Sequence, residues 1–128
     1  MLVAVAGAVE SIRMAFPEAV VVADDDGAGG SYVIIDPVTL GQKFLPPTTW
    51  IGGHITPQFP YSDIYPIFIA AEVHRSSGAA FVPPITSGHF FRGRPALQIS
   101  RRTNRLDPAL QSAASKFQKV LYWLIHQA

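Results

Sequence analysis

The chain has no cysteine among its 128 residues. This absence excludes disulfide bonds, thiolate metal ligands and thiol catalysis. Charged residues are also few, at 15% of the sequence, against an ordinary share of about 25%. Hydrophobic residues make up 48%, which is not typical of a disordered protein. The composition therefore predicts a folded domain, part of whose surface is apolar and faces a partner.

No apolar run approaches the roughly 20 residues that cross a bilayer. The first 16 residues, MLVAVAGAVESIRMAF, lack a basic leader and include Glu10 and Arg13, so they predict a helix rather than a signal peptide. We therefore expect a soluble, cytoplasmic protein with no membrane partner. A net charge of +1 gives no strong field for nucleic acid, which is an unlikely partner on this ground. The length fits one domain spanning residues 1–128.

Both ends of the chain carry helical patterns. Leu2, Val5, Val9, Ile12 and Phe16 recur every three or four residues, and Pro17 follows them. This spacing predicts a helix over residues 2–15, because apolar residues so spaced share one face and proline ends the hydrogen-bond ladder. Near the other end, Asp107 and Pro108 form a typical helix start. The apolar residues Leu110, Phe117 and Leu124 follow at intervals of seven residues. We expect a second helix over residues 108–125.

The middle of the chain has the character of strands. Two β-branched segments, residues 19–23 and SYVIID at 31–36, flank the turn-forming DDDGAGG. A third strand is expected between residues 43 and 55, at a sheet edge because Pro46 and Pro47 fall there. A fourth is predicted at IFIAAEVH, residues 67–74. Residues 75–100 have no clear period and predict a long irregular segment of functional importance.

Helices that bracket a run of strands indicate an α+β fold with an antiparallel meander of three to four strands. Motif searching finds no catalytic centre in it. The four histidines lie far apart without ligand spacing, so no metal site is predicted. Nothing predicts a phosphate-binding loop, a serine nucleophile elbow or a bound cofactor.

Three short segments resemble ubiquitin-conjugating enzymes. FPYSDIYPIFI at 59–69 is similar to the family's tyrosine-proline-phenylalanine and paired-proline turn. GRPALQISR at 93–101 resembles the Gly-x-x-Cys-Leu-x-Ile segment around the catalytic cysteine, with Ala96 at the cysteine position. LDPAL at 106–110 resembles the Trp-Ser-Pro-Ala-Leu that opens the next helix. The order of elements is also that of the family, so the resemblance implies a conjugating-enzyme fold over nearly the whole chain.

The departures from the family concern the reaction itself. The His-Pro-Asn that precedes the cysteine is absent, and residues 88–91, GHFF, occupy its region. The abbreviated chain resembles bacterial members of ubiquitin-like conjugation and antiphage-defence operons. The resemblance implies two partners, a ubiquitin-like modifier and an activating enzyme, and a transferase activity in which the modifier is carried as a thioester.

Alanine cannot form a thioester, which requires a thiolate. Two interpretations of Ala96 remain open. The first is a Cys→Ala replacement of an active carrier, which would also explain the complete absence of cysteine. The second is a natural non-catalytic scaffold that only binds ubiquitin-like proteins.

Other residues near Ala96 have possible roles. Ser100 could accept the modifier as an oxyester with His89 as its base. The simpler interpretation is that the Ser100 hydroxyl caps or solvates the arginine-rich turn. With a cysteine at position 96, His89 would support the oxyanion or assist as an acid or base. Arg92, Arg94 and Arg101 could steer a partner electrostatically. An alternative from another class is a small nucleic-acid-binding domain that uses the arginines with Phe90, Phe91 and Tyr122.

Overall fold

A computed structural model describes residues 1–127. The chain begins with α1 (Val3–Ala15) and ends with α2 (Ala113–Gln127). Between them lie β1 (Val20–Asp25), β2 (Ser31–Thr39), β3 (Phe44–Leu45), β4 (Thr48–Ile55), β5 (Ile67–Ala70), β6 (His74–Arg75), β7 (Ile85–Phe91) and β8 (Arg94–Ile99). In this part of the chain, six strands form one antiparallel sheet in the order β1-β2-β4-β5-β8-β7, and β3 pairs with β6 separately. The predicted α+β class is confirmed.

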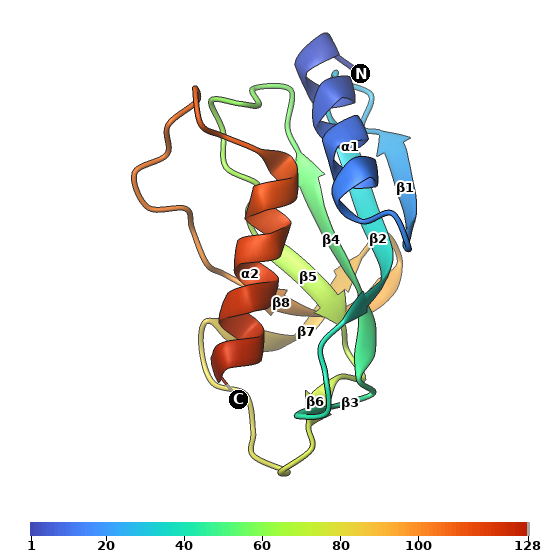
Figure 1. The fold of residues 1–128 in the computed structure, drawn as a ribbon, viewed down its shortest axis with the longest axis vertical. Helices are drawn as coiled ribbons and strands as arrows, with labels where there is room; N and C mark the ends of the chain where they lie inside the picture. Colours follow the sequence, from blue (N-terminus) through green and yellow to red (C-terminus); the bar gives the residue numbers. More distant parts are fainter. Residues whose placement is uncertain (128) are drawn as a thin grey trace.

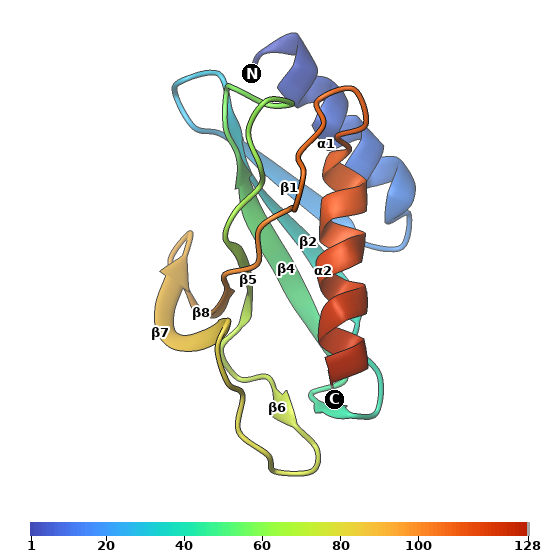
Figure 2. The same cartoon turned by 90° about the vertical axis from the view of Figure 1, so that its left-hand side faces the viewer.

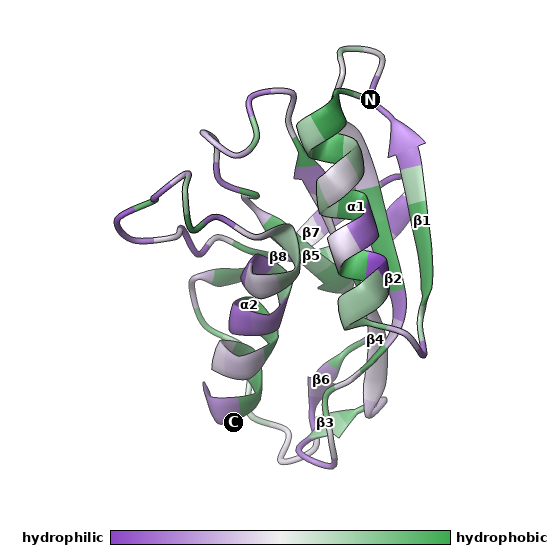
Figure 3. Cartoon of the chain, turned by 45° about the horizontal axis from the view of Figure 1, so that its top comes forward, coloured by the Kyte–Doolittle hydropathy of each residue, from purple (hydrophilic) through white to green (hydrophobic). Residues whose placement is uncertain are grey.

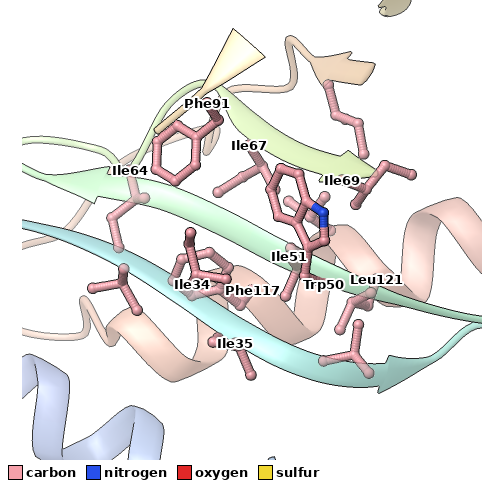
Figure 4. Close-up of a cluster of buried hydrophobic side chains, with 14 of the residues drawn as sticks. Ile34, Ile35, Trp50, Ile51, Ile64, Ile67, Ile69, Phe91, Phe117 and Leu121 are labelled. Atoms are coloured by element: carbon pink, nitrogen blue, oxygen red, sulfur yellow. The ribbon is translucent and has the colours of Figure 1, made fainter. Parts of the chain in front are cut away.

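Both helices cover the same face of the sheet, which leaves the other face open (Figures 1 and 2). Ile35 of β2, Ile51 of β4 and Ile67 of β5 lie on the helix-facing side of the sheet and gather with Phe117 and Leu121 of α2 (Figure 4). Gly53 makes this close approach possible. A Cβ atom there would lie 2.9 Å from Ile64 and 3.3 Å from the Phe117 ring, so a side chain would push α2 off the sheet.

The sheet is larger than the predicted meander of three to four strands. Residues 85–99 form the β7–β8 hairpin, so the expected irregular segment over 75–100 is wrong for more than half of its length. Phe91 pairs with Arg94 across the two-residue turn Arg92-Gly93, and both turn residues have positive φ, at 50° and 78°. Arginine is an uncommon residue at such a turn, so no local pattern predicts a hairpin at these positions. Residues 76–84 are irregular, as predicted.

The third strand does not lie at an edge. β4 pairs with β2 on one side and β5 on the other, and it begins after the two prolines instead of containing them. The prolines therefore remove no hydrogen bond from the sheet, and a central position is compatible with them.

The second helix begins five residues later than predicted. Asp107 does accept a hydrogen bond from the Ala109 amide, but this contact closes an isolated turn rather than the first turn of α2. The Ser112 hydroxyl accepts a bond from the Ser115 amide at the true start. Leu110 falls outside the helix and is 81% exposed, so it does not share a helix face with Phe117 and Leu124, as the repeat of seven predicted. The first helix, predicted over 2–15, is confirmed within one residue.

Candidate functional site

Ala96 lies in the middle of β8 and has no exposed surface. Its neighbours across the sheet are Ala70 of β5 on one side and His89 of β7 on the other. Position 96 is therefore held in a hydrogen-bonded strand, not in the open segment that the family resemblance implies. A modifier could reach a side chain here only if the neighbouring side chains moved apart.

The surface hollow next to this position is lined by other residues. It has a volume of about 380 Å³ and is lined by Trp50, Ala70, Ala71, Glu72, Arg94 and Pro95. Ala96 is not part of its lining. Ala71, where the chain leaves β5, is the exposed alanine of this lining.

His89 is brought next to Ala96, as the sequence hypothesis requires. The two residues are direct cross-strand partners, which places their Cα atoms about 5 Å apart. The imidazole is half-buried, and its Nε2 atom lies 2.9 Å from the Thr86 hydroxyl. A histidine in this place can exchange a proton only with a group that reaches the open face of the sheet.

Ser100 and His89 are not brought together. Ser100 follows β8 four residues after Ala96, which corresponds to about 13 Å along the strand. Its hydroxyl accepts a hydrogen bond from the Gln98 amide at 3.1 Å, and its own backbone N–H donates to the Pro84 carbonyl. The base therefore lies opposite Ala96 and bonds to Thr86, and the predicted pairing of Ser100 with His89 is not formed in this geometry.

The three candidate arginines belong to two separate groups. Arg92 and Arg94 lie at the β7–β8 turn and reach over the open face, where they pair with Asp24 at 3.4 Å and Asp36 at 3.9 Å. Arg101 follows β8 and its guanidinium lies over the Trp123 ring of α2. Because α2 covers the opposite face, these side chains do not form one steering patch (Figure 2).

The open face carries an aromatic cluster that the sequence analysis missed. The Phe91 ring stacks on Phe68 at 4.8 Å and on Trp50 at 6.2 Å, and it meets the edge of Tyr32. Gly52 lies beneath it, and a Cβ atom there would be 2.7 Å from the ring. Each of β2, β4 and β5 contributes one ring, Tyr32, Trp50 or Phe68, and the register of the strands brings the rings to one face, so no local pattern in the sequence indicates the cluster.

This arrangement also separates the residues of the nucleic-acid alternative. Phe91 is buried in the cluster, whereas Tyr122 lies exposed on α2. Phe90 is exposed next to Phe91 but points to the other side of β7, since successive strand residues alternate. The aromatic residues proposed for that alternative therefore do not form one binding surface.

The Asp26 carboxylate has three hydrogen-bond partners. Its Oδ1 atom accepts from the backbone amides of Ala28 and Gly30, and Oδ2 lies 2.7 Å from Nε2 of His54. The bond to His54, followed by the backbone donors, lowers the pKa of Asp26. The His54 ring in turn stacks on Tyr32. These contacts fix the β1–β2 turn at one end of the open face.

A second polar cluster lies at the start of α2. The Lys116 ammonium donates to Asp63 at 3.1 Å, to the Arg101 carbonyl at 2.9 Å and to the Thr103 hydroxyl at 3.1 Å. Burial lowers the pKa of Lys116. All three donors of the ammonium group have partners, so the lysine ties segments together and is not available as a nucleophile.

Within residues 1–127, no group of three histidine, aspartate or glutamate side chains is placed to hold a metal ion. In the same range no helix has the length and apolar character that a bilayer span requires. No protein-family model matches the chain, and neither curated proteins nor solved structures give a match.

The burial of position 96 leads to a first prediction. In an Ala96→Cys variant, the introduced thiol should react with a disulfide reagent roughly 100-fold more slowly than a surface thiol, since modification requires local opening of the sheet. An Ala71→Cys variant is the matched control, because Ala71 is exposed at the edge of the adjacent hollow. Equal rates for the two thiols would show that position 96 is accessible.

Proposed function

We propose that this chain is a conjugating-enzyme-like domain that binds a ubiquitin-like modifier without carrying it as a thioester. The resemblance of the motifs around positions 59–69 and 93–101 supports the partner class. The burial of Ala96 within β8 is the observation that favours binding over transfer. A carrier needs a nucleophile that the modifier's C-terminus can reach, and position 96 offers neither the sulfur nor the access.

The thioester carrier is the competing proposal, and one contact favours it. His89 is the direct neighbour of position 96, which is where a residue that assists acyl transfer would be needed. The competing proposal also requires a cysteine at position 96 and an opening of the β7–β8 hairpin. Rapid reaction of the thiol in the Ala96→Cys variant, at the rate of the Ala71→Cys control, would favour the carrier.

The open face of the sheet is the surface best suited to a protein partner. Val20 and Val22 of the edge strand β1 are 69% and 42% exposed, and they pair with Asp36 and Ile34 of β2. The valine part of β1 is hydrophobic and its far end, with the acidic residues, is hydrophilic (Figure 3). Exposed apolar residues beside the Arg92–Asp24 and Arg94–Asp36 pairs form an apolar centre with a charged rim, which is typical of interaction sites.

The test is an NMR titration of the isotopically labelled chain. The added proteins form a panel with the β-grasp fold, namely ubiquitin and small sulfur-carrier proteins. We expect at least one of them to shift amide signals of β1, β2 and the β7–β8 hairpin. A Val22→Asp variant should weaken this binding about tenfold, because it places a charge in the apolar centre. A Val3→Asp variant is the control, since Val3 is equally apolar but lies on α1 and is 90% exposed. No shift with any protein of the panel would contradict the proposal.

A further inference from the structure

A groove lies between the segment after β8 and the second half of α2, and three of the cationic side chains that line it, Arg101, Arg102 and Lys119, form no ion pair within residues 1–127. It has a volume of about 430 Å³, within the range of small-molecule sites. The side chains that give it its chemical character are Arg101, Arg102, Lys119, Tyr122, Trp123 and His126. Lys116 also lines it but is already paired with Asp63. The groove is separate from the open sheet face, because α2 covers the opposite side of the sheet.

The charge of this region differs from that of the rest of the chain. Seven of the ten lysines and arginines lie at or after Arg92, whereas Asp107 is the only one of the nine acids that does. Within residues 1–127, Arg101, Arg102 and Lys119 make no ion pair with any carboxylate, although Arg92 and Arg94 on the other face each do. A groove with three such cations attracts a multiply charged anion.

Flat side chains line the groove together with these cations. The Arg101 guanidinium lies 4.8 Å from the centre of the ring of Trp123, which also lines the groove, and the Arg102 guanidinium lies 3.9 Å from the ring of Tyr65, which is outside the lining. The Tyr122 ring stacks on His126 at 3.9 Å, and it is 65% exposed. Guanidinium groups held on aromatic rings are pre-oriented for two-point contacts with phosphate oxygens, and an exposed ring accepts a stacked base.

We propose that this groove binds a nucleoside phosphate, with Arg101, Arg102 and Lys119 on the phosphates and the Tyr122 ring against the base. An acidic peptide would satisfy the cations but would leave the exposed ring without a planar partner, so the rings favour a nucleotide. The nucleotide could be free or could be the end of a single strand, since both present the same groups. The proposal does not depend on the binding of a ubiquitin-like protein to the sheet.

Tryptophan fluorescence provides the measurement. A Trp50→Phe variant leaves Trp123 as the only tryptophan, and ATP should quench its emission in a saturable way. In that background, Arg101→Gln with Arg102→Gln should raise the dissociation constant for ATP about tenfold or more. Arg13→Gln with Lys43→Gln removes the same charge from exposed sites elsewhere and should change it less than about threefold.

The choice of ligands decides the outcome. Binding of ATP, or of a short single-stranded oligonucleotide alone, supports the proposal and identifies the source of the nucleotide. Equal binding of inorganic tripolyphosphate and ATP would overturn it, because the base would then contribute nothing. Equal binding of a glutamate-rich peptide would overturn it in favour of an acidic protein partner. The absence of saturable quenching at millimolar ATP, or equal losses in both pairs of variants, would also overturn it.

Discussion

A Lys116→Met variant should unfold about 10 °C or more below the unchanged protein, because it breaks a buried ion pair and leaves Asp63 without its cation. The lysine side chain is 4% exposed and the aspartate side chain 13%. Removing one partner of such a pair destabilises a protein by about 3 kcal/mol or more. In a chain of this size each kcal/mol corresponds to roughly 4 °C in the melting temperature. Thermal unfolding followed by circular dichroism measures the shift.

The loss should be larger than that of a lysine elsewhere on the same helix. Lys119 lies three residues on and is exposed, so Lys119→Met is the matched control and should change the melting temperature by no more than about 2 °C. The double variant Lys116→Met with Asp63→Asn should lose less than the sum of the single changes, because the two side chains contact one another. Equal losses for Lys116→Met and Lys119→Met would show that the cluster does not stabilise the fold.

The same cluster gives a pH dependence with a defined sign. Burial holds the pKa of Lys116 below 10.5 in the folded chain, whereas the unfolded chain retains the ordinary value. Between these two values the unfolded state binds more protons, so the free energy of unfolding rises with pH. The stability difference between the unchanged protein and Lys116→Met should therefore increase as the pH approaches 10.5. Comparison with the variant removes the contribution of the other titrating groups.

Local patterns predicted the elements that depend on short-range spacing. The first helix followed from apolar residues every three or four positions, and β2 followed from its β-branched run. The predicted start of α2 was wrong because Asp107 and Pro108 are typical of the first residues of an isolated turn as well as of a helix. Residues 107–110 satisfy that preference within a single turn. Leu110 lies seven residues before Phe117 but is exposed and outside the helix, so its spacing in the apolar repeat is a coincidence.

The candidate site could be predicted only in part, because its character depends on strand pairing. The sequence hypothesis placed His89 near Ala96, and the register of β7 and β8 makes them partners. The burial of Ala96 could not be foreseen, since it results from the pairing of β8 with β5 across 26 residues of chain at Ala70. The division of the arginines between two faces has the same origin. Arg92 and Arg94 lie on the hairpin over the open face, whereas Arg101 lies on the segment after β8, which runs to α2 on the opposite face.

The aromatic cluster on the open face leads to the last prediction. Phe91 is 6% exposed and packs on Phe68, Trp50 and Tyr32, so Phe91→Ala should destabilise the protein by about 3 kcal/mol, as truncation of a buried phenylalanine typically does. Because Phe91 packs the β7–β8 hairpin against Trp50 and Gly52 of β4, the loss should be accompanied by faster hydrogen exchange in that hairpin. Denaturant unfolding and exchange monitored by NMR measure the two effects.

The neighbouring phenylalanine provides the control. Phe90 is 70% exposed on the same strand, and Phe90→Ala should change the unfolding free energy by less than about 1 kcal/mol. Gly52→Ala tests the packing from the opposite side, since its methyl group would collide with the Phe91 ring. That substitution should be destabilising on its own and should cost less in the Phe91→Ala background, where the ring is gone. If Phe90→Ala and Phe91→Ala were equally destabilising, the hairpin would be held by its own strand pairing, and the aromatic cluster would contribute nothing to its position over the sheet.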